Sequence, residues 1–276
     1  MRTVLTIAGF DPSSGAGITA DLMVFSAHGL FGASAITALT VQSTRGVRSV
    51  HATEAAVLSD TLHTVFDDLQ PAGIKIGMIG SAANVQIIAE FLKYARSCGI
   101  TLPIVLDPVL RSSSGKGLLD GEGEEVFRHE LLPLVDWVTP NTSELAWLSG
   151  VKIELREQVS AAARELQVST ARPAGAAPLG VIATGGHLEP PDDLLLSAEG
   201  DEVWFSGERV HTRSTHGTGC AFSSAFLSRL VLGESPARAA RAAKDYVAGA
   251  LKAAPEIGHG AGPMNLLWPL TVLPRG

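Results

Sequence analysis

The stretch TVLTIAGFDPSSGAGITAD, residues 3–21, contains the unit on which the fold prediction rests. It opens with an apolar run, TVLTIAG, that is typical of a buried strand. A Gly/Ser-rich loop follows and leads to a helix expected to begin near Gly17. The loop matches neither the G-x-G-x-x-G dinucleotide pattern nor the phosphate-binding loop that ends in Lys-Ser/Thr. The stretch therefore predicts a strand, loop and helix outside those two nucleotide-binding folds.

Apolar runs of the same kind recur along the chain, each ending in or near Gly, Pro, Asp or Val. They are SAITALTV (34–41), AGIKIG (72–77), PIVLDP (103–108), DWVTP (136–140) and LGVIATG (179–185). Helical patterns lie between them, for example over 53–69 and 81–97. This alternation predicts a doubly wound α/β fold, with ligands bound beyond the carboxyl ends of the strands.

Two later segments complete the expected architecture. Residues 188–212 contain short β-rich runs separated by turn residues, which indicates antiparallel strands in a hairpin. The Ala/Pro-rich segment 169–178 is interpreted as a surface loop, because apolar strands resume at Leu179 with unchanged character. We therefore expect a single domain over residues 1–276.

Composition narrows the class of protein. The chain has 276 residues, of which 46% are hydrophobic, and this favours a packed globular fold. Its cysteines, Cys98 and Cys220, are too far apart for a paired metal motif and suit a reducing compartment. No apolar stretch reaches the ~18 residues of a membrane span, and we expect a cytoplasmic protein. A formal charge of −7 argues against nucleic acid or an anionic membrane as a partner.

The segment HGTGC, residues 216–220, carries the strongest chemical signal. Gly217 and Gly219 allow successive backbone N–H groups to face an anion, and the following helix adds the positive end of its dipole. Cys220 lies in the first helical turn, where that field favours the thiolate and makes the side chain a candidate base or nucleophile. The alternative is a Gly-rich loop before a helix that simply buries a cysteine.

Other polar residues follow the predicted strands. Asp21 lies one turn into the first helix, where it either complements the dipole or binds a ligand. Asp107 ends a buried strand and suits magnesium, although capping of a turn explains it equally well. Asn141 and Glu144 have the spacing of a helix capping box. The paired glycines of ATGGHL (183–188) allow close approach of a ligand or a tight turn.

Taken together and in order, these segments resemble the ribokinase-like small-molecule kinases. Within them the chain is similar to the hydroxymethylpyrimidine/phosphomethylpyrimidine kinases of thiamine biosynthesis. The resemblance rests on IAGFDPSSGAGITADLMVFSAHG, ITALTVQSTRGV, IKIGMIG, VLDPVL, VTPNTSEL, GGHL, HGTGCAFSSA, AKDYV and GHGAGPMNLL. It implies a three-layer α/β/α sandwich with a mostly parallel central sheet, a homodimer, and ATP and Mg²⁺ as co-substrate and cofactor. The implied reaction is phosphorylation of 4-amino-5-hydroxymethyl-2-methylpyrimidine and of its monophosphate.

The resemblance also implies roles for individual positions. The pyrimidine would be bound by Gly9, Asp21, Val41, Gln42 and Met78. An anion hole for the transferring phosphoryl group would be formed by Gly217, Thr218, Gly219 and Cys220, with Cys220 as the general base. The nucleotide would contact Asn141, Thr184, Gly185, Gly186 and Lys244. Magnesium would be held by Asp107 and Glu144.

One departure and three alternatives follow from the same residues. Many family members have V-K-G-G where this chain has Ala183 and Thr184 before the paired glycines, so a cation is missing beside the nucleotide. Arg111 and Lys116 are the candidates to replace it. The alternatives are a pyridoxal kinase of the same superfamily, a thiol enzyme with Cys220 as nucleophile and His216 as base, and a non-catalytic pyrimidine sensor.

Overall fold

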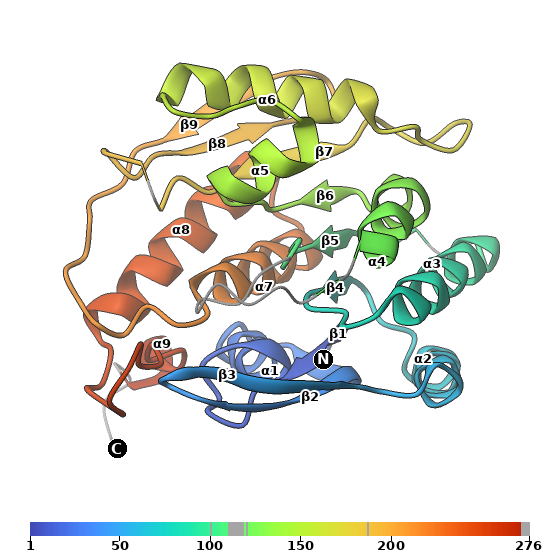
Figure 1. The fold of residues 1–276 in the computed structure, drawn as a ribbon, viewed down its shortest axis with the longest axis horizontal. Helices are drawn as coiled ribbons and strands as arrows, with labels where there is room; N and C mark the ends of the chain where they lie inside the picture. Colours follow the sequence, from blue (N-terminus) through green and yellow to red (C-terminus); the bar gives the residue numbers. More distant parts are fainter. Residues whose placement is uncertain (100, 110–118, 120, 187, 272–276) are drawn as a thin grey trace.

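A computed structural model describes residues 1–99, 101–109, 119, 121–186 and 188–271 (Figure 1). These residues form a nine-stranded sheet in the order β3-β2-β1-β4-β5-β6-β7-β8-β9. The strands are β1 (Thr3–Phe10), β2 (Phe31–Ser43), β3 (Gly46–Ala52), β4 (Ile74–Ile76), β5 (Ile104–Leu106), β6 (Trp137–Val138), β7 (Gly180–Ala183), β8 (Asp193–Leu196) and β9 (Glu202–Phe205). All pairings from β2 to β7 are parallel, whereas β3, β8 and β9 add antiparallel edges. The predicted mostly parallel sheet is confirmed.

Helices cover both faces of this sheet. The described helices are α1 (Gly17–Ala27), α2 (Ala55–Leu69), α3 (Ala82–Ser97), α4 (Gly121–Val126), α5 (Thr142–Ser149), α6 (Arg156–Ser169), α7 (Thr218–Val231), α8 (Pro236–Lys252) and α9 (Trp268–Thr271), with short π and 3₁₀ turns at Phe127–Leu131 and Leu132–Leu134. Buried apolar side chains of α1, α7 and α8 form one core on the sheet. Those of α2, α3, α5 and α6 form the other. The result is the predicted three-layer α/β/α sandwich (Figure 1).

The strands at the edges of the sheet were predicted only in part from the sequence. The antiparallel pair predicted within 188–212 is present as β8 and β9. The run RVHT in that segment forms no strand, because the chain there crosses toward α7 as irregular backbone. The strand β3, with sequence GVRSVHA, was not predicted. Its partly exposed side chains do not produce the apolar run that marks the buried strands.

Two loops at the carboxyl ends of the strands approach each other through glycine. Gly17, at the start of α1, has φ of +61°, and a Cβ atom there would lie 2.2 Å from the carbonyl oxygen of Gly9. Gly217, just before α7, has φ of +80°, and a Cβ atom there would lie 1.9 Å from the carbonyl oxygen of Gly15. The loop before α1 and the loop before α7 are therefore in direct backbone contact.

A fully buried ion pair connects the sheet to the helices above it. Lys75, in the middle of β4, lies 2.9 Å and 3.1 Å from the two carboxylate oxygens of Asp21 on α1. Thr6 of β1 donates to Asp21 Oδ2 at 2.6 Å, and Ser224 of α7 donates to Oδ1 at 2.8 Å. Burial opposes the charge of Lys75, but the carboxylate of Asp21, together with Cys220 and Asp107, outweighs it and raises the lysine pKa. Four elements are thus joined at one carboxylate.

Membrane insertion receives no support from the helices. Within the part of the chain that the structure describes, no helix is long and apolar enough to cross a bilayer.

The buried pair generates a stability prediction. Lys75→Met would leave the Asp21 carboxylate buried without its cation, and we expect the free energy of unfolding to fall by about 3–5 kcal/mol. Urea denaturation monitored by circular dichroism measures this change. The double variant Lys75→Met/Asp21→Asn removes both charges and should regain part of the loss. A double variant no more stable than the single one would contradict an electrostatic origin.

Candidate active site

A cavity of about 1940 Å³ lies at the carboxyl ends of the parallel strands. It brings together most of the residues that the sequence singled out. Its lining includes Gly9, Gln42, Met78, Asp107, Asn141, Glu144, Thr184, Gly186, Gly217, Thr218, Gly219, Cys220 and Lys244. The predicted acceptor, phosphoryl and nucleotide residues therefore share one continuous space.

Three of the predicted ligand residues, Val41, Gly185 and Asp21, lie outside this lining. Val41 was expected to form an apolar wall, but its side chain is 48% exposed on the opposite face of β2. Alternation along the strand explains this, because Thr40 and Gln42 on either side both face the cavity. Gly185 packs away from the cavity, where a Cβ atom would lie 1.8 Å from the carbonyl oxygen of Asp192. Glycine is therefore required at this position because a side chain would collide with the backbone of Asp192.

Asp21 is the third correction. Its carboxylate is fully buried, and both oxygens are already bound by Lys75, Thr6 and Ser224. It does not line the cavity, so the expected contact with a pyrimidine is not supported. Of the two readings of this helix carboxylate, the structural one is favoured.

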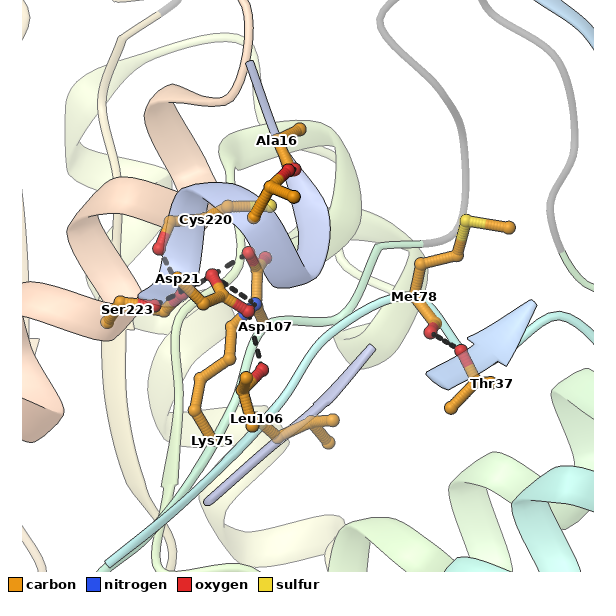
Figure 2. A network of polar contacts seen from close by, with 12 residues as sticks. Ala16, Asp21, Thr37, Lys75, Met78, Leu106, Asp107, Cys220 and Ser223 are labelled. Carbon is orange, nitrogen blue, oxygen red and sulfur yellow. Dashed lines mark hydrogen bonds and ion pairs between the residues drawn. The ribbon is translucent and has the colours of Figure 1, made fainter. Parts of the chain in front are cut away.

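The turn before α7 has the geometry of an anion site. Gly217 is the N-cap of the helix in a left-handed conformation, and its carbonyl accepts the first helical hydrogen bond from Ala221 at 2.9 Å. Asp107 faces the same turn, since a Cβ atom on Gly219 would lie 3.6 Å from Asp107 Oδ2. Figure 2 shows Asp107, Cys220 and Ser223 gathered around Asp21, with Lys75 below them. Ser223 donates to Asp107 Oδ2 at 3.4 Å.

The pKa of the Cys220 thiol is shifted in the direction opposite to the one expected from the sequence. Burial raises the pKa of the Cys220 thiol to about 12, and the carboxylates of Asp107 and Asp21 add to this effect. Lys75 and the N–H of Gly17 oppose the shift without cancelling it. The predicted thiolate is therefore wrong for this arrangement, because burial beside two carboxylates outweighs the helix dipole.

Asp107 is perturbed by the same surroundings. Burial raises its pKa to about 6; Lys75 opposes this shift, and the nearby Asp21 carboxylate adds to it. A hydrogen bond from the Cys220 thiol stabilises the ionised form. At neutral pH the pair is therefore a thiol next to a carboxylate, and the carboxylate is the better proton acceptor of the two.

The capping box predicted at α5 is present. Asn141 Oδ1 accepts hydrogen bonds from the backbone N–H groups of Ser143 and Glu144, each at 3.0 Å, and Glu144 Oε2 accepts from the N–H of Asn141 at 2.9 Å.

Among the described residues, no group of three or more His, Cys, Asp or Glu side chains is arranged to hold a metal ion. Magnesium needs only one or two carboxylates when phosphates and water supply the rest, and Asp107 and Glu144 on the cavity wall fit that donor set.

On the nucleotide side, Lys244 is engaged by protein groups. Its ammonium lies 2.8 Å from Asp193 Oδ2 and donates to the carbonyl of Pro191 at 2.8 Å. Asp193 Oδ1 in turn accepts from the N–H of Gly185 at 2.8 Å. Lys244 thus fixes the paired-glycine loop, and its charge is largely neutralised. Arg111 and Lys116, the candidate replacements for the missing lysine, lie outside the described residues.

Sequence reasoning missed two residues, Asp11 and Lys75. Lys75 is a lone charge inside the apolar run IKI, and that interruption is a signal that could have identified it. Asp11 stood within the Gly/Ser loop and was given no role; it lies 2.7 Å from His216 Nε2. His216 is thus paired with Asp11 and lies 3.0 Å from Gln42. This pairing removes the support for a thiol enzyme in which His216 activates Cys220.

Comparisons with known proteins identify the family of the chain. The family model described as phosphomethylpyrimidine kinase matches residues 11–265. A hydroxymethylpyrimidine/phosphomethylpyrimidine kinase of Staphylococcus aureus is 37% identical over 267 residues, which cover 96% of this chain and 93% of the relative. The thiamine biosynthesis bifunctional protein ThiED of Geobacter sulfurreducens is also 37% identical, over 95% of this chain and 52% of that protein.

Solved structures show the same fold. The phosphomethylpyrimidine kinase of Clostridium difficile is 33% identical with a TM-score of 0.76, covering 90% of this chain and 98% of that one. The pyridoxal kinase of Staphylococcus aureus in complex with AMP-PCP has a higher TM-score, 0.86, at a lower identity of 28%, covering 99% of this chain and 96% of that one. The ribokinase-like fold is therefore confirmed, and sequence identity favours the pyrimidine kinases. By its motifs, its cavity and these matches, the chain belongs to the phosphomethylpyrimidine kinase family.

Proposed function

We propose that this kinase transfers the γ-phosphoryl group of ATP to the hydroxymethyl group of 4-amino-5-hydroxymethyl-2-methylpyrimidine, and then phosphorylates the resulting monophosphate, in thiamine biosynthesis. The observation that carries the proposal is one cavity containing both a helix-start anion turn, Gly217 to Cys220, and a ring pocket with Gln42 and Met78. A kinase needs an acceptor and a phosphoryl group in line at one place. That shared space supports phosphoryl transfer over simple binding, and so weighs against a sensor.

The acceptor end of the cavity combines apolar and polar groups. Gly9 leaves room beside Met78, since a Cβ atom at Gly9 would lie 3.1 Å from the methionine sulfur. The backbone of Met78 is fixed because its carbonyl accepts from Thr37 Oγ1 at 2.6 Å (Figure 2). Gln42 supplies an amide to the same cavity. The combination suits an aromatic ring with polar edges.

At the other end, the backbone N–H groups of Gly217 to Cys220 and the dipole of α7 would hold the transferring phosphoryl group. Asp107 and Glu144 would hold magnesium on the nucleotide phosphates, where it supplies neutralising charge when bound. Asn141, Thr184 and Gly186 line the nucleotide side, and Lys244 acts there by holding the paired-glycine loop.

The acceptor hydroxyl must lose a proton during the transfer. A neutral thiol at Cys220 does not take this proton as a simple base. We infer a relay in which Sγ accepts the hydroxyl proton while its own proton passes to the Asp107 carboxylate, so that no thiolate accumulates. The hydrogen bond from the thiol to the Asp107 carboxylate supports this order of transfers. Asp107 would then hold magnesium through a water molecule, which leaves its carboxylate able to take the proton.

A homodimer remains a prediction from the family resemblance. Leu39 and Val41 on the outer face of β2 are 52% and 48% exposed. They form apolar surface of the kind that a second copy would cover.

The first prediction tests the reaction itself. An ADP-release assay with the aminopyrimidine, its monophosphate and pyridoxal should give the highest kcat/KM for the two pyrimidines. Phosphorylation of pyridoxal alone would establish the alternative that the close fold match to pyridoxal kinase favours. Binding of the pyrimidine without ADP release would instead identify a sensor.

A second prediction concerns the relay. Cys220→Ala removes the intermediate proton carrier, and we expect kcat to fall about 100-fold or more with little change in the pyrimidine KM. Cys220→Ser keeps a group that both accepts and donates a proton, so its kcat should lie between the two. Steady-state kinetics of the three proteins measure this. Near-normal kcat in Cys220→Ala would remove the thiol from the mechanism.

A third prediction concerns the missing cation. Because Lys244 is neutralised by Asp193, Thr184→Lys should restore positive charge beside the triphosphate and tighten ATP by about 1 kcal/mol at low salt, with a smaller gain as salt rises. Thr184→Met adds comparable bulk without charge and should give no gain. Isothermal titration at two salt concentrations compares the variants. Equal affinities for the Lys and Met variants would show that no cation is missing at this position.

A further inference from the structure

Asp11 connects three parts of the active site. This residue is 3% exposed and lies in the loop between β1 and α1. Oδ1 accepts hydrogen bonds from the N–H and Oγ of Ser13 at 2.8 Å and 2.7 Å, and Oδ2 accepts from the N–H of Ala16 at 3.1 Å. Oδ2 also lies 2.7 Å from Nε2 of His216, which precedes the anion turn. Three of these four contacts are made by donors of Ser13 and Ala16, and the role of the His216 nitrogen depends on where the imidazole proton lies.

The charge of Asp11 follows from these contacts. Burial opposes ionisation, but the hydrogen bonds from His216 and Ser13 outweigh it and lower the pKa of Asp11 below its usual value. At neutral pH the group is a carboxylate, which accepts hydrogen bonds and donates none. The proton between Asp11 and His216 therefore resides on Nε2 of the imidazole.

The imidazole ring is held in place on both sides. His216 is 8% exposed, and its backbone N–H donates to the carbonyl of Gly262 at 3.2 Å. The ring packs on Gly15, where a Cβ atom would lie 2.3 Å from Cδ2 of His216. Packing on Gly15 and the contact with Asp11 therefore both favour the observed orientation of the ring.

The fixed proton constrains Gln42. The Gln42 amide nitrogen lies 3.0 Å from His216 Nε2. Because Nε2 carries a proton and an amide NH₂ accepts none, these two atoms cannot share a hydrogen bond. Turning the amide by 180° places the carbonyl oxygen at this point, where it can share the Nε2 proton with Asp11 Oδ2 in a three-centre hydrogen bond. The NH₂ group then faces the cavity that Gln42 lines.

We propose that Asp11 and His216 are positioning residues that fix the hydrogen-bonding polarity of Gln42 and thereby select the acceptor ring. With the NH₂ group facing the cavity, Gln42 requires a ring nitrogen that accepts a hydrogen bond. A 4-aminopyrimidine offers such a nitrogen beside its amino group. Its 4-oxo counterpart carries N–H at the same ring position and presents the reverse pattern. The inference rests on the proposed pyrimidine kinase function. It adds that the enzyme recognises its substrate by a ring nitrogen that accepts a hydrogen bond from Gln42.

The experiment compares kcat/KM for 4-amino-5-hydroxymethyl-2-methylpyrimidine and for its deaminated 4-oxo analogue. The wild-type enzyme should prefer the amino ring by at least about tenfold, since a reversed edge leaves buried polar groups unpaired. His216→Leu removes the fixed donor and frees the amide to turn, so the preference should fall at least about fivefold. Asp11→Ala lets the imidazole proton move to Nδ1, and its preference should fall as well.

A matched variant distinguishes the effect of the N–H donor of His216 from the effect of losing the packing of its side chain. His216→Gln keeps an N–H donor near the position of Nε2 and should retain the preference for the amino ring. The ratio of the two kcat/KM values does not depend on how much of each variant is folded. An unchanged ratio in His216→Leu, a ratio lost equally in His216→Gln, or a wild-type enzyme indifferent to the two rings would overturn the inference. A wild-type enzyme that phosphorylates neither ring would instead overturn the proposed function.

Discussion

The Lys75–Asp21 ion pair is the interaction on which the active-site end of the molecule depends. A carboxylate without exposed surface joins β1, β4, α1 and α7, and these elements carry the ring pocket and the anion turn. Removing such a pair from water is costly, and only complete hydrogen bonding makes it tolerable. The same pair sets the field around Asp107 and Cys220, where Lys75 opposes the effect of burial on both groups. The same ion pair therefore holds these elements together and influences the pKa values of Asp107 and Cys220.

Much of the fold was predictable because the buried strands are continuous apolar runs. Runs such as TVLTIAG and LGVIATG mark β1 and β7 directly, and the intervening periodicity marks the helices. The strand β3 was not predictable in this way, since its residues are only partly buried at the edge of the sheet. Apolar periodicity reports burial, so an exposed strand leaves little trace of itself in the sequence.

The candidate site was predictable as a set of loops but less so as individual contacts. Glycine and acidic residues at strand ends identified the turn at Gly217 and the carboxylate of Asp107. Local sequence could not show whether Asp21 faces the ligand or the core, because that depends on Lys75, 54 positions away. It likewise could not show that burial would raise the pKa of Cys220. Side-chain direction and desolvation arise from tertiary packing, which a motif does not encode.

The contact between Asp11 and His216 joins residues 205 positions apart in the chain. All residues from Asp11 to His216 must therefore be synthesised before the two loops of the site can meet. Contacts of such long range close late in folding, because the entropy of a large chain loop opposes them until the sheet is in place. A nascent chain emerging from the ribosome can form β1 and the first helices early. It acquires its active site only after His216 has been synthesised, so catalytic activity reports that the long-range contacts of the fold have formed.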